Sequence, residues 1–278
     1  MKEYIGEHFQ SIAHLLRANE RPVNDTFKGH SLSSNKDDVS FTKTHSYAEA
    51  ADLITKGYEE PVEKIKRGVT QNVRNYAASK TAVKTDIVGY APCVPNAILG
   101  LPNSMLNKAT SVKKSKVISI VYDSTGAWHV DADEFIKSGI AVLSAIASLE
   151  MSGYRVELKV AFLDCGGSRQ NMFSTVTLKD WRQPLDVKKI AFPICHPSML
   201  RRIGFRQIET NPELTDTSYI GGYGTSKVSA GVYDGAKRLE DELRKTGKLA
   251  AHERYTNLLI NQHCNYDPEE ILKHLGLK

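Results

Sequence analysis

The sequence lacks the features that would place the chain in several common classes. No apolar run approaches the roughly 20 residues that a helix needs to span a bilayer. The N-terminus carries charges throughout, unlike a secretory signal. The four cysteines include no C-x-x-C pair, so neither a zinc site nor a disulfide framework is indicated. We therefore expect reduced thiols, a cytoplasmic location and no membrane partner.

Motifs for nucleotide binding and nucleophilic catalysis are also missing. The glycine-rich stretches CGGSRQ and YIGGYGTSK match neither G-x-x-x-x-G-K-[ST] nor G-x-G-x-x-G, and no G-x-S-x-G elbow occurs. A hydrolase site would have to be assembled from distant residues such as Asp123, Asp164 and His196. We therefore expect a non-enzymatic protein without a cofactor.

The composition is that of a folded protein with a mild excess of positive charge. Of the 278 residues, 41% are hydrophobic and 25% are charged, which is sufficient for a buried core. The formal net charge of +5 permits phosphate neutralisation but is equally compatible with an ordinary solvated surface.

The centre of the chain predicts an α/β fold. The apolar run from Val117 to Tyr122 is typical of a parallel strand buried on both faces. A helix that starts at Asp131 and a strand over 154–164 complete a strand–helix–strand unit. Further predictions are a hairpin partner at 172–178, a strand at 185–194, and helices at 196–210, 235–247, 250–260 and 267–275.

The N-terminal part predicts helices and one irregular segment. A helix is expected over 7–19, another after a capping box formed by Ser46 and Glu49, and a third from Pro61 onward. The apolar, proline-rich segment 86–107 is expected to be packed against the body of the protein. We divide the chain into an N-terminal helical and irregular segment (1–112), an α/β core (113–230) and C-terminal helices (231–278).

The stretch VISIVYDSTGAW, followed by a helix and GYRVELKVAFLD, resembles the opening of a von Willebrand factor A-type domain. This resemblance implies a doubly wound, Rossmann-like sheet with a metal motif, Asp-x-Ser-x-Ser, after the first strand. Asp123 matches the Asp, Thr125 replaces the first Ser, and Ala127 replaces the second. The site would be degenerate, with Mg²⁺ at Asp123 and Thr125. In the alternative, Asp123 forms an Asx-turn.

Three other stretches resemble a family of uncharacterised tailed-phage proteins. They are SYAEAADLITKGY, DIVGYAPCVPNAILGLPNSM and HPSMLRRIGFRQIE. The resemblance covers much of the chain and implies a phage protein that works in the cytoplasm of the host cell.

Our leading hypothesis is a protein that binds single-stranded DNA or RNA in phage transcription, replication or RNA handling. Arginines on one helix could grip phosphates, and tyrosines among glycines could stack on unpaired bases. The expected contact residues are Arg201, Arg202, Arg206, Tyr219, Tyr223, Lys227, Lys113, Lys114 and Lys116.

Each of these features also has an ordinary structural explanation. The glycine-rich loop could be a tight turn, and the arginines could form a solvated face paired with Glu209 or Asp216. The rival hypothesis is a protein-interaction module in which an A-type domain docks a phage or host protein, with or without Mg²⁺ at Asp123. In either case we expect a homo-oligomer.

Overall fold

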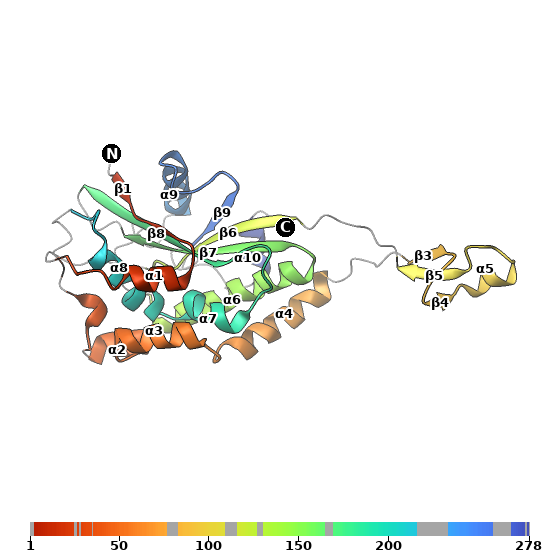
Figure 1. Ribbon diagram of the computed structural model, residues 1–278, viewed down its shortest axis with the longest axis horizontal. Coiled ribbons are helices and arrows are strands. Elements are labelled where there is room, and N and C mark those ends of the chain that lie inside the picture. The colour runs from red at the N-terminus through yellow and green to blue at the C-terminus, as the bar shows by residue number, and fades with distance from the viewer. Residues whose placement is uncertain are drawn as a thin grey trace.

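The computed structural model describes residues 3–24, 27, 29–34, 36–76, 83–108, 116–126, 130–164, 169–215, 233–257, 268–275 and 277. Inside its helices and strands, the side chains at 37, 70–76, 83, 108, 233–238, 269, 270 and 274 are not described. The described residues form a body of helices around a mixed sheet, and a second small sheet (Figure 1). This arrangement confirms the predicted α/β class.

The main sheet draws its strands from the whole length of the chain. Strand β6 (Val117–Asp123) lies between two parallel neighbours, β7 (Arg155–Asp164) and β9 (Glu253–Thr256). Strand β8 (Gln170–Lys179) pairs antiparallel with β7, and it pairs parallel with both β1 (Glu3–Ile5) and β2 (His8–Phe9). The sheet therefore extends beyond the predicted core of residues 113–230, because both ends of the chain contribute strands.

Helices cover both faces of this sheet. On one face, Ile118, Ile120 and Tyr122 of β6 belong to a large core that includes residues of α6 (Ala132–Met151) and α7 (Val187–Cys195). On the other face, Val121 packs with residues of α9 (Tyr233–Lys245) in a smaller core. The other body helices are α1 (Ile12–Ala18), η1 (His30–Leu32), α2 (Lys36–Thr42), α3 (Tyr47–Lys56), α4 (Val62–Tyr76), η2 (Met199–Gly204), α8 (Phe205–Thr210) and α10 (Pro268–His274).

Predictions that rested on local chemistry are confirmed. The Ser46 hydroxyl accepts a hydrogen bond from the Glu49 amide at 3.1 Å, and the Glu49 carboxylate accepts from the His45 amide at 2.6 Å. Helix α3 ends at Gly57, whose φ of +95° favours glycine. Helices α4 and α6 and the β7–β8 hairpin also form where they were predicted.

The predicted strand at 185–194 is wrong, because these residues form helix α7. The Asp186 carboxylate caps the helix by accepting from the Lys189 amide at 3.3 Å. Gly139 of α6 lets α7 come close, since a Cβ at this glycine would lie 2.5 Å from the Cys195 Cα. Short apolar runs do not distinguish a buried helix from a buried strand.

Two further predictions fail for tertiary reasons. The helix expected over 250–260 is wrong, because residues 253–256 form β9 alongside β6, and Glu253 pairs with Lys159 of β7 at 2.6 Å. The helix expected over 7–19 begins only at Ile12, because His8 and Phe9 pair with β8.

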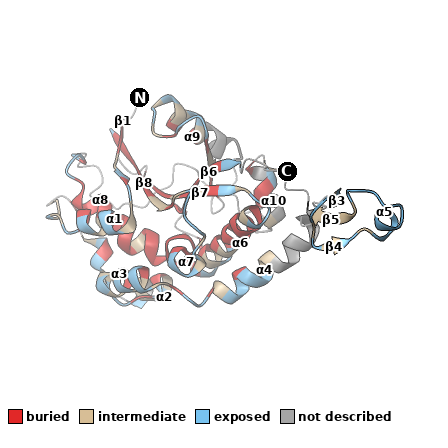
Figure 2. Cartoon of the chain, turned by 45° about the vertical axis from the view of Figure 1, so that its right-hand side comes forward, coloured by how far each residue is buried: buried red, intermediate tan, exposed pale blue. Residues whose placement is uncertain are grey.

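The proline-rich segment forms a small antiparallel sheet with one short helix. Its elements are β3 (Val83–Asp86), β4 (Ala91–Pro92), α5 (Val94–Ile98) and β5 (Met105–Lys108), with β5 in the middle of the sheet. Figures 1 and 2 both draw these elements at one end of the molecule, apart from the body. The prediction that this segment is packed against the body is wrong.

Candidate functional site

Asp123 lies at the carboxyl end of β6 and is fully buried. Its Oδ1 accepts hydrogen bonds from the backbone amide and the hydroxyl of Thr125, at 2.9 and 2.5 Å. Its Oδ2 accepts from the Tyr255 hydroxyl and from Asn257 Nδ2, the latter at 2.9 Å. Burial raises the pKa of the Asp123 carboxyl, whereas these four donors favour its ionised form and oppose the rise.

This geometry is that of the Asx-turn alternative. The bond from the Thr125 amide closes the turn, and the Leu163 amide donates to the Thr125 hydroxyl at 2.8 Å, which ties the turn to β7. Within the described ranges, no group of three His, Cys, Asp or Glu side chains is placed to hold a metal ion. Binding of Mg²⁺ at Asp123 and Thr125 stays a prediction, and it would require these protein donors to move aside.

Arg202 holds the N-terminal segment in place. Its side chain is only 1% exposed, and burial lowers its pKa. The guanidinium donates to the carbonyl oxygens of Ser31 and Thr44, at 3.1 and 2.9 Å, and to that of Ser33. A guanidinium enclosed by carbonyl groups in this way is not placed to contact an external phosphate.

The other two arginines of the predicted phosphate grip also contact the protein. The guanidinium of Arg201 stacks over Phe41 and Phe205, with 4.8 and 5.4 Å between its Cζ and the ring centroids. Arg206 donates to the Asn19 carbonyl at 3.2 Å and lies 3.5 Å from the buried Glu209 carboxylate. Arg201 and Arg202 lie in η2, which winds as a π-helix, and Arg206 lies in α8, which follows it directly. Burial and these internal contacts therefore leave no exposed arginine face of the kind that the spacing of Arg202 and Arg206 predicts.

Most of the remaining predicted contact residues cannot be placed. Tyr219, Tyr223, Lys227, Lys113 and Lys114 lie outside the described residues. Lys116, which immediately precedes β6, is exposed.

His196, one of the residues from which a hydrolase site would have to be assembled, is enclosed by aromatic rings. It stacks on Phe192 with 4.5 Å between the ring centroids, and Tyr58 meets it edge-on at 5.0 Å. Its Nδ1 accepts from the Ser198 amide at 3.2 Å, and burial lowers its pKa to about 4. These contacts describe a neutral imidazole with a structural role.

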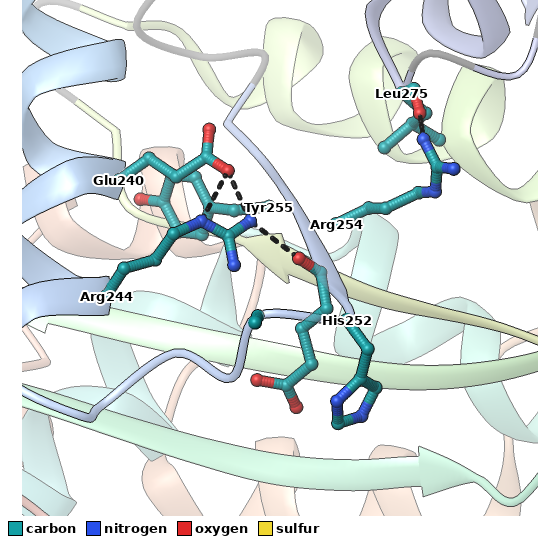
Figure 3. Close-up of a pocket in the computed structure, with 8 residues that line it drawn as sticks. Glu240, Arg244, His252, Arg254, Tyr255 and Leu275 are labelled. Atoms are coloured by element: carbon teal, nitrogen blue, oxygen red, sulfur yellow. Dashed lines mark hydrogen bonds and ion pairs between the residues drawn. The ribbon is translucent and has the colours of Figure 1, made fainter.

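A polar pocket of about 490 Å³ lies where α9, β9 and α10 meet (Figure 3). Arg244 in this pocket donates to Glu240 and to the carbonyl oxygens of Ala250 and Glu253, at 2.5 to 3.1 Å. Arg254 donates to the Leu275 carbonyl. These cations therefore join the C-terminal elements to one another and to the edge of the sheet.

The sequence reasoning missed the most exposed apolar surface of the described structure. Residues 87–107, which we call the apolar tip, run from the end of β3 into β5 and contain no Asp, Glu, Lys, Arg or His. Val88 and Ile98 are 74% and 79% exposed, and Figure 2 shows α5 largely in the colour of exposed residues. The large hydrophobic side chains exposed on the tip are Ile87, Val88, Tyr90, Val94, Ile98, Leu99 and Leu101. The sequence signal for this segment was its lack of charged residues, which does not distinguish an exposed apolar surface from a packed one.

Positive charge is concentrated on both sides of the apolar tip. Residues 64–122 contain ten Lys and Arg but only one acidic residue, Asp86. The rest of the chain has 27 Lys and Arg against 31 Asp and Glu, so this one segment carries more than the whole net charge of +5. Lys64 and Arg67 are exposed on α4, and Lys84 on β3 pairs with Asp86 at 2.6 Å.

Comparison with known proteins identifies a family but no function. No curated protein and no solved structure has a significant match to the chain. One family model, described as a domain of unknown function (DUF7192), matches residues 2–274 and so spans the body, the small sheet and the last helix. The chain therefore belongs to the DUF7192 family.

Proposed function

We propose that this protein is a non-enzymatic interaction module that docks its partner through the apolar tip. The observation that carries the proposal is the exposure of seven large hydrophobic side chains on a segment without a single charge. Exposed apolar surface gathered on one segment of a folded protein is characteristic of interaction sites. The exposed side chains come from the β3–β4 connection, from α5 and from the residues just after it.

In this proposal the body is a scaffold with A-type architecture. Two features support the finer fold assignment: an interior strand that ends in an Asp-x-Thr turn, and helices on both faces of the sheet. The contacts of Asp123, Arg202 and His196 serve internal structure, which supports a role without catalysis. A phage origin, the host cytoplasm as location, and a homo-oligomeric state remain predictions from the sequence.

The proposal predicts that the tip can be made polar without loss of stability. Replacing Ile98 and Leu99 together by serine should change the free energy of unfolding by no more than about 0.5 kcal/mol, because both side chains are exposed. The same change should reduce the fluorescence of a bound apolar dye such as bis-ANS, since apolar surface is removed. The matched control is Met151→Ser, which removes an exposed hydrophobic side chain from the end of α6.

A large loss of stability in the Ile98→Ser, Leu99→Ser variant would show that the tip belongs to a core. It would then not be an available docking surface, and the proposal would fail.

Nucleic-acid binding is a second candidate, favoured by the concentration of positive charge in residues 64–122. The described structure gives the three arginines internal roles, so the lysines on either side of the tip would have to contact the phosphates. Fluorescence anisotropy with single-stranded DNA and RNA over a salt series tests this function. Binding should weaken as salt rises, and it should weaken further when Lys113, Lys114 and Lys116 are replaced by glutamine.

A further inference from the structure

Several backbone groups of the apolar tip are paired by hydrogen bonds within the tip itself. The Cys93 amide donates to the Ser104 carbonyl at 2.7 Å, and the Leu101 amide donates to the Asn96 carbonyl at 3.0 Å. Asn side chains bond two further carbonyl groups, Asn96 to that of Asn103 and Asn107 to that of Val88. Backbone N–H and C=O groups without hydrogen bonds raise the free energy of irregular chain in lipid. The hydrogen bonds within the tip lower this cost and so favour its entry into an apolar phase.

The side chains of the tip match the interfacial layer of a bilayer. Its exposed residues are mainly aliphatic, and Tyr90 combines an apolar ring with a hydroxyl, as residues at membrane interfaces commonly do. Because the tip has no charged side chain, none would have to be desolvated on insertion. Among the described helices, none is long and apolar enough to cross a membrane.

Charge identifies the kind of lipid. The cation-rich sequence lies on both sides of the tip, from residue 64 to Lys84 and from Lys108 to Lys116, with Asp86 as its only acid. Insertion of an apolar element and attraction of its flanking lysines to anionic headgroups both contribute to membrane binding. In the sequence, the apolar tip, which would insert into the bilayer, thus lies between two stretches rich in Lys and Arg, which would be attracted to the anionic headgroups.

We propose that the apolar tip docks this protein on the surface of an anionic lipid bilayer. This inference rests on the proposed function and names the partner class for the same surface. The expectation of no membrane partner followed from the absence of a spanning segment, and surface docking needs none. A nucleic-acid strand fits the tip less well, because bases are gripped by aromatic stacking and by cations at the contact, and Tyr90 is the single exposed aromatic residue of the tip.

Flotation with lipid vesicles tests this inference on the full-length protein. The wild type should float with vesicles of phosphatidylcholine and phosphatidylglycerol, less with phosphatidylcholine alone, and less at high salt. The Ile98→Ser, Leu99→Ser variant should bind the mixed vesicles with an affinity at least about tenfold lower than that of the wild type, because two inserted aliphatic side chains are lost. Met151→Ser should bind like the wild type, and replacing Lys113, Lys114 and Lys116 by glutamine should remove the preference for anionic lipid.

Two results would overturn the inference. One is a wild type that does not float with the anionic vesicles, and the other is a tip variant that floats as well as the wild type. If the wild type fails to float while its tip still binds the apolar dye, the lipid assignment falls and the proposed docking surface stands. If the tip substitutions instead weaken binding to single-stranded RNA or DNA, the partner is a nucleic acid and the lipid inference is wrong.

Discussion

Replacing Arg202 by methionine should destabilise the protein by roughly 3 kcal/mol or more, because the buried carbonyl groups of the N-terminal segment lose their donor. The guanidinium donates to the carbonyl oxygens of Ser31, Ser33 and Thr44 and reaches the Thr42 hydroxyl at 3.4 Å. Methionine fills similar space but offers no donor. Chemical denaturation measures the change, and hydrogen exchange should show faster opening of residues 29–44.

The matched control is Arg182→Met, in which an exposed arginine that stacks on Trp181 is replaced in the same way. This control should stay within about 0.5 kcal/mol of the wild type. A phosphate-gripping Arg202 would give the opposite pattern: unchanged stability together with weaker binding to nucleic acid. That pattern would contradict the structural role assigned here to this arginine.

Replacing Asp123 by alanine should also cost roughly 3 kcal/mol, because four donors lose their acceptor in a buried place. These donors are the backbone amide and the hydroxyl of Thr125, the Tyr255 hydroxyl and the side-chain amide of Asn257. Together they join the ends of β6 and β9. Asp123→Asn, which keeps one acceptor oxygen, should fall between alanine and the wild type. Thermal and chemical unfolding measure both variants.

Asp52→Ala serves as the control, because Asp52 is an exposed carboxylate whose ion pair with Lys56 lies on the surface of α3. A surface pair of this kind contributes at most about 1 kcal/mol. Adding Mg²⁺ to the same thermal measurement separates the two explanations of Asp123. A rise in the midpoint for the wild type that disappears in Asp123→Ala would favour the metal site over the Asx-turn.

Sequence reasoning succeeded where a structure is determined locally. The apolar run of β6, the α6 helix that follows Asp131 and the capping box at Ser46 each carry their own signal, and each forms as predicted. It failed at α7 and β9, where short segments take their conformation from the elements they contact. Strands β1 and β2 are too short to leave a periodic pattern.

The candidate site was harder to predict than the fold, because burial decides what a charged residue does. Arg201, Arg202 and Arg206 look like a phosphate grip in the sequence, but two of them donate to backbone carbonyls and the third stacks on aromatic rings. The apolar tip was mispredicted in the opposite direction, because apolar residues that we expected to be packed are exposed. Hydrophobic residues near prolines usually indicate a packed segment, and sequence alone did not reveal that Ile98 and its neighbours would be exposed.

Site-specific photocrosslinking tests most directly the central claim that the apolar tip is a docking surface. A photoreactive phenylalanine derivative would be placed at Val88, at Leu99 and, as an exposed control on α7, at Lys189, in cells that produce the protein. We predict crosslinked products, to lipid if the further inference holds, from positions 88 and 99 but not from 189. Equal crosslinking from all three positions, or none from the tip, would contradict the account.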